Sequence, residues 1–449
     1  MNRPNVILIV LDTLREDCSG ALSALEGMGF KKYSNVLATD SWTVPSHASI
    51  FTGLMPSVHG VHRIFNVDNN AKMLAELCTK ALRHNETITS LVRELGYETY
   101  AWSCNPLVSP SFGYEFNDFT PYDFYGKAAH EPPYLYGKSA YIVKLARLVL
   151  DREFETIYSQ ASLKSKRALG KALGLHPMEK GSKYVRRDLK RRELKSPFFL
   201  FVNLMEAHDP YNWSDGFSHE RIQYNSITGK IGELGLNWRE RYPMHASLAT
   251  SRAMDAVSSL RRYLDDSVVI VTSDHGQLLG EGGMYGHGYT MNDNLHRVPL
   301  YVRYPGGGAP PDQAGRYVSL TSTKSLVDHA IGGDSAPVGS DVVLAESFGP
   351  SSSALMRASS RDEHEKMLSA FDHRVKAYTA KGTGIYNKHT DTVEQIQGDL
   401  TAKEMRELAS GLPTFDHDFS RPAALGESVG AFAHDDMEVR ERLRRLGYE

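Results

Sequence analysis

The chain has few cysteines, no long apolar run and almost no net charge. Three cysteines among 449 residues are too few and too scattered for a disulfide framework or a cysteine-based zinc site, and they fit a reducing compartment. Lysine and arginine number 51 against 54 acidic residues, so the net charge of −3 gives no general attraction to nucleic acid or to an anionic membrane. We therefore expect no nucleic-acid partner.

No segment reaches the ~20 apolar residues that a membrane-spanning helix needs. The apolar run at residues 6–11 is too short, and no small-residue cleavage site follows it, so the run is typical of a buried strand. We expect a cytoplasmic protein without a membrane partner. With 41% hydrophobic and 23% charged residues, the composition is that of a globular protein.

Apolar runs and helical patterns alternate along the chain. Runs rich in β-branched and apolar residues at 6–11, 198–204 and 268–272 are typical of parallel strands that are covered on both faces. Residues 86–103 predict a helix, a stop at Gly96 and a further strand, and residues 297–306 predict a fifth strand. This alternation favours an α/β fold, a doubly wound and mostly parallel central sheet flanked by helices. Sites in such sheets lie beyond the carboxyl ends of the strands.

The chain divides into two predicted parts. Residues 1–335 form the main α/β domain, with a helical insertion at about 120–195. Residues 336–449 form a smaller C-terminal α+β subdomain with short antiparallel strands and a terminal helix. Six of the ten residues 186–195 are lysine or arginine, which we interpret as a solvated helix face. The alternative is an inserted cap that attracts an anionic substrate.

Three candidate metal ligands follow the first and fourth strands. Asp12 comes directly after the run at 6–11, where a carboxylate suits a hard metal, although a cap of the next helix is the alternative. Asp274 and His275 are adjacent in an irregular turn and can converge on one ion, and such an O/N pair suits Zn²⁺ or Mn²⁺. His287 follows within a segment where six glycines between 276 and 288 allow close approach of a ligand.

The segment SWTVPSHASIFTG at 41–53 predicts a helix N-terminus beside a candidate nucleophile, Thr43. The free N–H groups and the positive dipole end of a helix suit an anionic group in transfer. A hydroxyl needs a base or a metal to attack at neutral pH, and the three candidate ligands would hold that metal. His47, one turn further, could contact the same oxyanion. The alternative is that Thr43 only caps the helix.

Seven motifs in order resemble the sulfatase branch of the alkaline phosphatase superfamily. They cover most of the chain outside about 120–195. In chain order they are PNVILIVLDTLRED, TVPSHASIFTGLMPSVHG, ETITSLVRELGYETYAWSCNP, FFLFVNLMEAHDPY, TSDHGQLLGEGGMYGHG, NLHRVPLYVRYPG and RERLRRLGYE.

The resemblance implies the fold of that family, with residues 1–335 as the catalytic domain. It implies a divalent ion bound by Asp12, Asp274 and His275, with Thr43 as both metal-facing group and nucleophile. We expect one Mn²⁺, Zn²⁺, Ca²⁺ or Mg²⁺ ion.

The resemblance also implies that His208 and His287 bind the transferred group or protonate the leaving oxygen. In many sulfatases a lysine stands at the position of His287. The two histidines leave a second ion possible.

Two departures from the family pattern bear on the chemistry. Sulfatases carry Cys or Ser followed by x-Pro-x-Arg, which is converted to formylglycine, whereas here Thr43 begins the string and His47 replaces the arginine. Threonine cannot become formylglycine. The second carboxylate after the first strand is also missing, because the pair reads Asp12-Thr13. An unmodified threonine resembles the phosphodiesterases, phosphomutases and phosphoethanolamine or glycerophosphate transferases of the superfamily, so we expect Thr43 to attack phosphorus.

Four functional hypotheses follow. The first is a metal-dependent hydrolase of a phosphate mono- or diester; the second is a phosphoryl transferase to a sugar or lipid acceptor. The third is a sulfuric ester hydrolase without formylglycine, and the fourth is a binding protein that keeps the fold. The partner would be an anionic ester, either a small molecule or linked to a glycan or lipid, and a homo-oligomer is possible.

Overall fold

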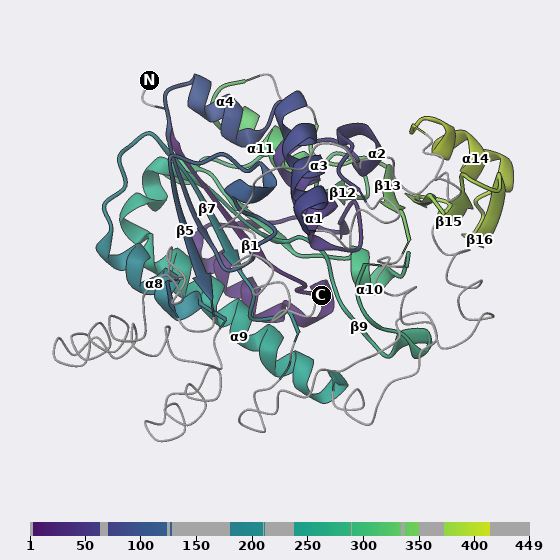
Figure 1. Ribbon diagram of the computed structural model, residues 1–449, viewed down its shortest axis with the longest axis horizontal. Coiled ribbons are helices and arrows are strands. Elements are labelled where there is room, and N and C mark those ends of the chain that lie inside the picture. Colours follow the sequence, from purple (N-terminus) through teal and green to yellow (C-terminus); the bar gives the residue numbers. More distant parts are fainter. Residues whose placement is uncertain are drawn as a thin grey trace, which may run out of the picture.

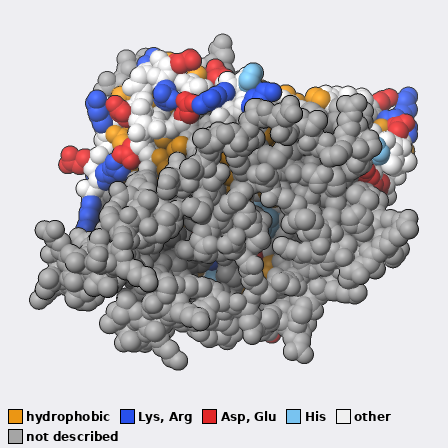
Figure 2. All heavy atoms as spheres, in the orientation of Figure 1, with side chains coloured by type: hydrophobic (Ala, Val, Ile, Leu, Met, Phe, Trp, Pro, Cys, Tyr) orange, Lys and Arg blue, Asp and Glu red, His pale blue; other side chains and the backbone are white. Residues whose placement is uncertain are grey.

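The computed structural model describes residues 3–62, 71–123, 126–127, 180–209, 211, 238–288, 290–333, 337–349 and 372–413. These residues form a large mixed sheet between two layers of helices and a smaller antiparallel sheet beside it (Figure 1). On the face shown in Figure 2, described basic and acidic side chains are interspersed along the upper edge, in keeping with the near-zero net charge. Within the described ranges, no helix combines the length and apolarity needed to cross a membrane.

The central sheet has eight strands in the order β2-β11-β8-β1-β7-β4-β5-β6. Five neighbouring strands run parallel: β8 (Ser267–Ser273), β1 (Asn5–Leu11), β7 (Phe198–Leu204), β4 (Glu98–Ser103) and β5 (Asp118–Asp123). The antiparallel strands lie at the edges: β2 (Lys31–Lys32), β11 (Leu300–Arg303) and β6 (Gly126–Lys127). The predicted mostly parallel sheet is therefore confirmed.

Strand β1 lies at the middle of the sheet and separates two hydrophobic cores. Its side chains alternate, so Val6, Leu8 and Val10 enter one core, while Ile7 and Ile9 enter the other. Helices cover both faces (Figure 1), which explains why β1 is apolar from Val6 to Leu11. The first core packs under α1 (Thr43–Thr52), α3 (Ala71–His84), α4 (Ile88–Glu94) and α11 (Ser322–Ala330), and the second under α8 (Ser182–Arg191) and α9 (Trp238–Ser259).

The second sheet is antiparallel, as the pattern within 336–449 predicts. Its strands are β13 (Val342–Ser347), β14 (Arg374–Thr379), β15 (Gly382–Asn387) and β16 (Thr392–Gly398), and α14 (Ala402–Ser410) packs on it. The expected terminal helix lies outside the described residues. The short elements elsewhere are β3 (Val36–Leu37), α2 (Pro56–His59), β9 (Leu278–Leu279), β10 (Tyr285–Gly286), α10 (Asp293–His296) and β12 (Val318–Ser319).

The start of the expected helical insertion is a strand. Residues from about 120 were expected to be helical, but β5 runs to Asp123 and pairs with β4 in the central sheet. Its sequence, DFTPYD, contains a proline and no apolar run, so the periodicity gave no strand signal there. Residues 128–179 lie outside the described ranges. At the far end, α8 buries Val185 and Leu189 and exposes Arg187 and Lys190, as an amphipathic helix with a solvated basic face does.

Candidate active site

Polar side chains meet beyond the carboxyl ends of the parallel strands. Asp12 follows β1, Asn105 lies just after β4, His208 follows β7, and Asp274 with His275 follows β8. The first residue of α1, Thr43, enters the same space from the adjacent helix layer. Because the five strands run parallel, their ends bring together residues that are far apart in the sequence.

The structure brings together the four residues predicted to hold a metal. One ligand atom each from Asp12, Asp274 and His275 lies within 4.8 Å of the other two, and all three side chains are fully buried. The Thr43 hydroxyl oxygen lies 3.5 Å from Oδ2 of Asp12 and 3.3 Å from Nε2 of His275. The predicted nucleophile is thus in contact with the candidate ligand group.

Hydrogen bonds to the protein orient Asp274 and His275. Oδ1 of Asp274 accepts hydrogen bonds from the backbone N–H groups of Thr13 and His275, at 3.1 and 2.9 Å. The His275 ring donates its Nδ1–H to the carbonyl oxygen of Gly276 at 2.9 Å, which leaves Nε2 as an acceptor.

Two buried carboxylate oxygens, Oδ1 of Asp12 and Oδ2 of Asp274, receive no hydrogen bond within the described part of the chain. Buried oxygens without donors are costly, and a cation satisfies them. Two carboxylates, one imidazole and one hydroxyl form a donor set that fits a divalent ion.

Burial also explains the acid–base state of this group. Burial, with a smaller effect of Asp274, raises the pKa of Asp12 to about 6, and burial raises the pKa of Asp274 to about 7. Burial lowers the pKa of His275, which favours the neutral imidazole that a metal requires. Without a cation, the two carboxyl groups therefore retain protons up to a higher pH than ordinary aspartates do.

Asn105 holds Asp12 in place, a role that the sequence does not reveal. Its side-chain amide donates a 2.7 Å hydrogen bond to Oδ2 of Asp12, and its Oδ1 accepts one from the backbone N–H of Leu107. Asn105 is fully buried. The signal that could have identified it is its place two residues after a parallel strand, at the same sheet edge as Asp12 and Asp274.

His47 is turned toward the protein interior. Its Nδ1 lies 3.0 Å from the carbonyl oxygen of Thr43 and 3.4 Å from Oδ2 of Asp274, and Asn203 donates to its Nε2 at 3.3 Å. Burial lowers the pKa of His47 to about 3, so the ring is neutral at pH 7. Both ring nitrogens thus contact the protein, and the expected contact with the oxyanion stays a prediction.

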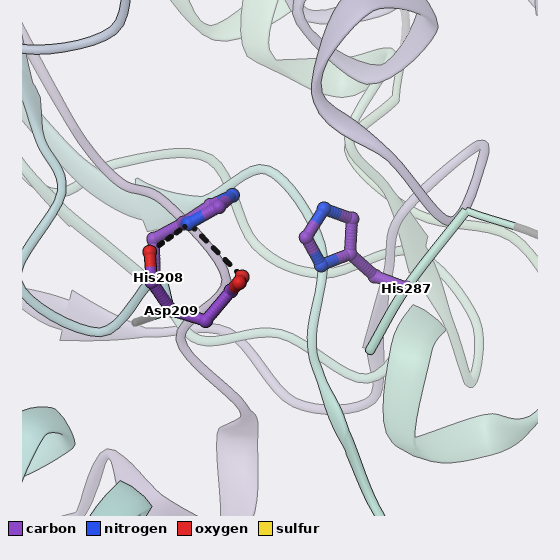
Figure 3. A group of neighbouring side chains, drawn as sticks. All are labelled: His208, Asp209 and His287. Carbon is purple, nitrogen blue, oxygen red and sulfur yellow. Dashed lines mark hydrogen bonds and ion pairs between the residues drawn. The ribbon is translucent and has the colours of Figure 1, made fainter. Parts of the chain in front are cut away.

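His208 and His287 face each other beside the candidate metal group, with Asp209 next to them (Figure 3). Their ring centres are 5.0 Å apart, and the rings of His287 and His275 are 4.7 Å apart. Nδ1 of His208 lies 2.6 Å from the backbone oxygen of Asp209, and Nδ1 of His287 lies 2.6 Å from Oε1 of Gln277. With Nδ1 as donor, Nε2 is the nitrogen through which each ring can exchange a proton with a ligand.

Arg15 connects the loop after β1 to the loop after β8. Its guanidinium donates to Asp17, to Glu281 at 2.7 Å and to Asn294 at 3.0 Å. Tyr242 holds the backbone of this loop. Its hydroxyl accepts a hydrogen bond from the backbone N–H of Arg15 and donates one to the carbonyl oxygen of Thr13. These contacts position the glycine-rich segment that carries His287.

A protein-family model matches most of the chain. The model described as Sulfatase matches residues 4–332, which is most of the chain. The chain belongs to the sulfatase family. This confirms the resemblance of the ordered motifs and, with it, the alkaline phosphatase superfamily.

Curated relatives of this sulfatase-family chain include a sulfatase and a sulfotransferase. The chain is 25% identical over 130 residues to the N-acetylglucosamine-6-O-sulfatase of Bacteroides thetaiotaomicron. The match covers 27% of this chain and 23% of that protein. It is also 25% identical over 147 residues to a low-salt glycan biosynthesis sulfotransferase of Haloferax volcanii. That match covers 31% of this chain and 33% of the sulfotransferase. The matches thus span only about a quarter to a third of these curated relatives.

Among solved structures, the phosphonate monoester hydrolase of Agrobacterium radiobacter superposes with a TM-score of 0.54 at 16% identity. The superposition covers 99% of this chain and 95% of that one. At this identity the likeness shows the fold alone.

Proposed function

We propose that the protein is a metal-dependent hydrolase of a phosphate mono- or diester, with Thr43 as the nucleophile. The observation that supports it best is the contact of the Thr43 hydroxyl with Asp12 and His275 at the first turn of α1. A sulfatase-family chain with threonine here cannot form formylglycine, so the hydroxyl itself has to attack. The positive end of α1 favours the anionic group on which it acts.

A divalent ion would be held by Asp12, Asp274 and His275, with Thr43 as a fourth group. When bound, it would lower the pKa of the Thr43 hydroxyl and withdraw charge from the phosphoryl oxygens. Mn²⁺, Zn²⁺, Ca²⁺ and Mg²⁺ all suit this donor set, and we favour one ion over two.

The side chains of the protein account for the remaining steps. Oγ1 of Thr43 releases its proton to solvent water and forms a bond to phosphorus, while the bond from phosphorus to the leaving oxygen breaks. His208 or His287, whose Nδ1 atoms are held by oxygen acceptors, gives the leaving oxygen a proton from Nε2. Water then attacks the phosphorylated threonine and gives a proton to the imidazole that had lost one. The bond from phosphorus to Oγ1 breaks, Oγ1 takes up a proton from solvent, and the phosphate product leaves.

A second candidate is group transfer, in which an acceptor hydroxyl replaces that water. The partial likeness to a glycan biosynthesis sulfotransferase supports it, because the same covalent intermediate serves both outcomes. The acceptor would be a sugar or a lipid. A sulfuric ester hydrolase that uses threonine directly is the third candidate, which the likeness to a sulfatase supports and the missing formylglycine precursor opposes.

The test compares turnover of three aryl esters, a phosphate monoester, a phosphate diester and a sulfate, by protein of measured metal content. Thr43→Ala is expected to lower phosphoester turnover by about 10³-fold or more, whereas Thr43→Ser, which keeps a hydroxyl, is expected to retain activity within about tenfold. Thr52→Ala is the matched control, because Thr52 is also buried on α1 and its hydroxyl, among the described residues, makes hydrogen bonds only with Ala48 and Leu54. Dominant sulfate turnover would contradict the phosphoester proposal.

A further inference from the structure

Lys180 is a buried lysine whose ammonium group makes no hydrogen bond within the described part of the chain. The residue is 4% exposed, and its Nζ is fully enclosed. Lysine is almost never buried without a partner, because burying an ammonium group costs free energy unless an anion or an acceptor compensates it. The position therefore requires a physical explanation.

The backbone around Lys180 is anchored to the loop that carries His208. Oε1 of Glu206 accepts hydrogen bonds from the N–H groups of Lys180 and Ser182, at 3.0 and 3.2 Å. These bonds fix the start of α8 against the residues that follow β7. The ammonium lies 5.6 Å from the ring centre of Tyr211, so its near side is covered by an aromatic face.

The charge of Lys180 acts on the candidate active site. Its electrostatic partners are Asp209, Glu206 and Asp12, of which Asp12 is a candidate metal ligand. Burial lowers the pKa of Lys180 to about 8, so the ammonium stays protonated at pH 7. A positive charge is thus close enough to Asp209 and Asp12 to interact with both carboxylates.

Two positive charges that the family pattern implies are replaced in this chain. Sulfatases carry an arginine at the position of His47 and in many cases a lysine at the position of His287. Within the described ranges, both ring nitrogens of His47 contact the protein: Nδ1 lies 3.0 Å from the carbonyl oxygen of Thr43, and Nε2 lies 3.3 Å from the amide of Asn203. An anionic group in transfer needs compensating positive charge. His47 and His287 do not carry the permanent charge of the arginine and lysine that they replace.

We propose that Lys180 binds the anionic ester, its ammonium donating hydrogen bonds to oxygens of the tetrahedral group or of its leaving side. This deepens the proposed function and rests on it. The three N–H donors of a lysine suit a phosphate-like oxyanion as a compact point charge. Lys180, two residues before α8, would thus provide the positively charged contact to the anion that other residues provide in sulfatases.

The alternative is that Lys180 only balances the charge of Glu206 and Asp209. A balancing lysine would be expected to donate a hydrogen bond to one of these carboxylates, and Nζ donates none within the described residues. A charge-balancing role predicts that removal of the ammonium disturbs folding or metal binding first. A ligand-binding role predicts that it disturbs anion binding alone.

The test is calorimetric titration of the metal-loaded protein with inorganic phosphate, and separately with sulfate, because neither depends on turnover. Lys180→Met is expected to weaken phosphate binding by about 10- to 100-fold, the range for a hydrogen bond from a charged donor. The matched control is Lys190→Met, which removes the same charge from an exposed position of α8 and is expected to change affinity by less than about twofold. If Lys180→Met does not fold, Lys180→Gln gives the same comparison.

The outcomes separate this proposal from the proposed function. A weakened anion affinity with unchanged metal content and melting temperature supports it. Affinity like that of the wild type, loss of metal together with the anion, or a wild type that binds neither anion overturns it. If the wild type binds sulfate in place of phosphate and Lys180→Met weakens that binding, the phosphoester assignment fails while the role of Lys180 stands.

Discussion

Replacement of Asn105 by alanine should weaken metal binding without touching a ligand. The amide of Asn105 donates to Oδ2 of Asp12 over 2.7 Å, and both side chains are fully buried. A hydrogen bond to a charged group contributes about 1.5–3 kcal/mol, which corresponds to a factor of about 10 to 100 in affinity. Loss of a residue that orients a metal ligand typically has an effect of about that size.

The assay is competition between the metal-free protein and a chelator of known affinity for the added ion. Asn117→Ala is the control, because its side chain also makes hydrogen bonds but to strand β4, accepting from the backbone N–H and the hydroxyl of Thr99 at 3.0 and 2.7 Å. Its metal affinity should match the wild type even if its stability falls. Metal affinity of Asn105→Ala within about threefold of the wild type would refute the reasoning that Asp12 is a ligand oriented by this amide.

Three further predictions concern pH, leaving groups and the core. Because the pKa values of Asp12 and Asp274 are raised to about 6 and 7, a bound ion must displace protons, so the rise in Tm on adding metal should grow as pH increases from below 6 to above 7; a pH-independent rise would contradict this. If His208 or His287 protonates the leaving oxygen, its alanine variant should lose more kcat on alkyl than on nitrophenyl phosphates, by about 10²-fold or more; equal losses would indicate binding instead. Ile9→Ala in β1, fully buried, should lower the free energy of unfolding in urea by about 2–5 kcal/mol, and a loss below about 1 kcal/mol would contradict the core assignment.

The sequence was informative where chemistry follows directly on a regular element. Asp12 and Asp274 come at the ends of apolar strands, and parallel strands deliver their ends to one edge, so their proximity could be expected before the structure was known. Thr43 could be placed in the same way, because a proline two residues later marks the first turn of a helix. These inferences depend only on local pattern and on the geometry of a parallel sheet.

Other features depend on tertiary contacts that no local pattern carries. An asparagine in a loop has the same sequence appearance whether or not it supports a carboxylate, so the role of Asn105 was missed. Lys180 precedes the basic stretch at 186–195 and carries no pattern of its own, and its contacts with Glu206 and Tyr211 come from tertiary packing. The rotation of His47 toward Asn203 likewise depends on a strand more than 150 positions away.

The central claim is that Thr43 carries the transferred phosphoryl group. The most direct test mixes the metal-loaded protein with an excess of an aryl phosphate ester, quenches with acid within one turnover and maps the modified peptide by mass spectrometry. Our account predicts a phosphoryl group on Thr43, trapped at higher occupancy in variants of His208 or His287 that slow its hydrolysis. An unmodified Thr43 in protein that turns the ester over, or a phosphoryl group on another residue, would contradict it.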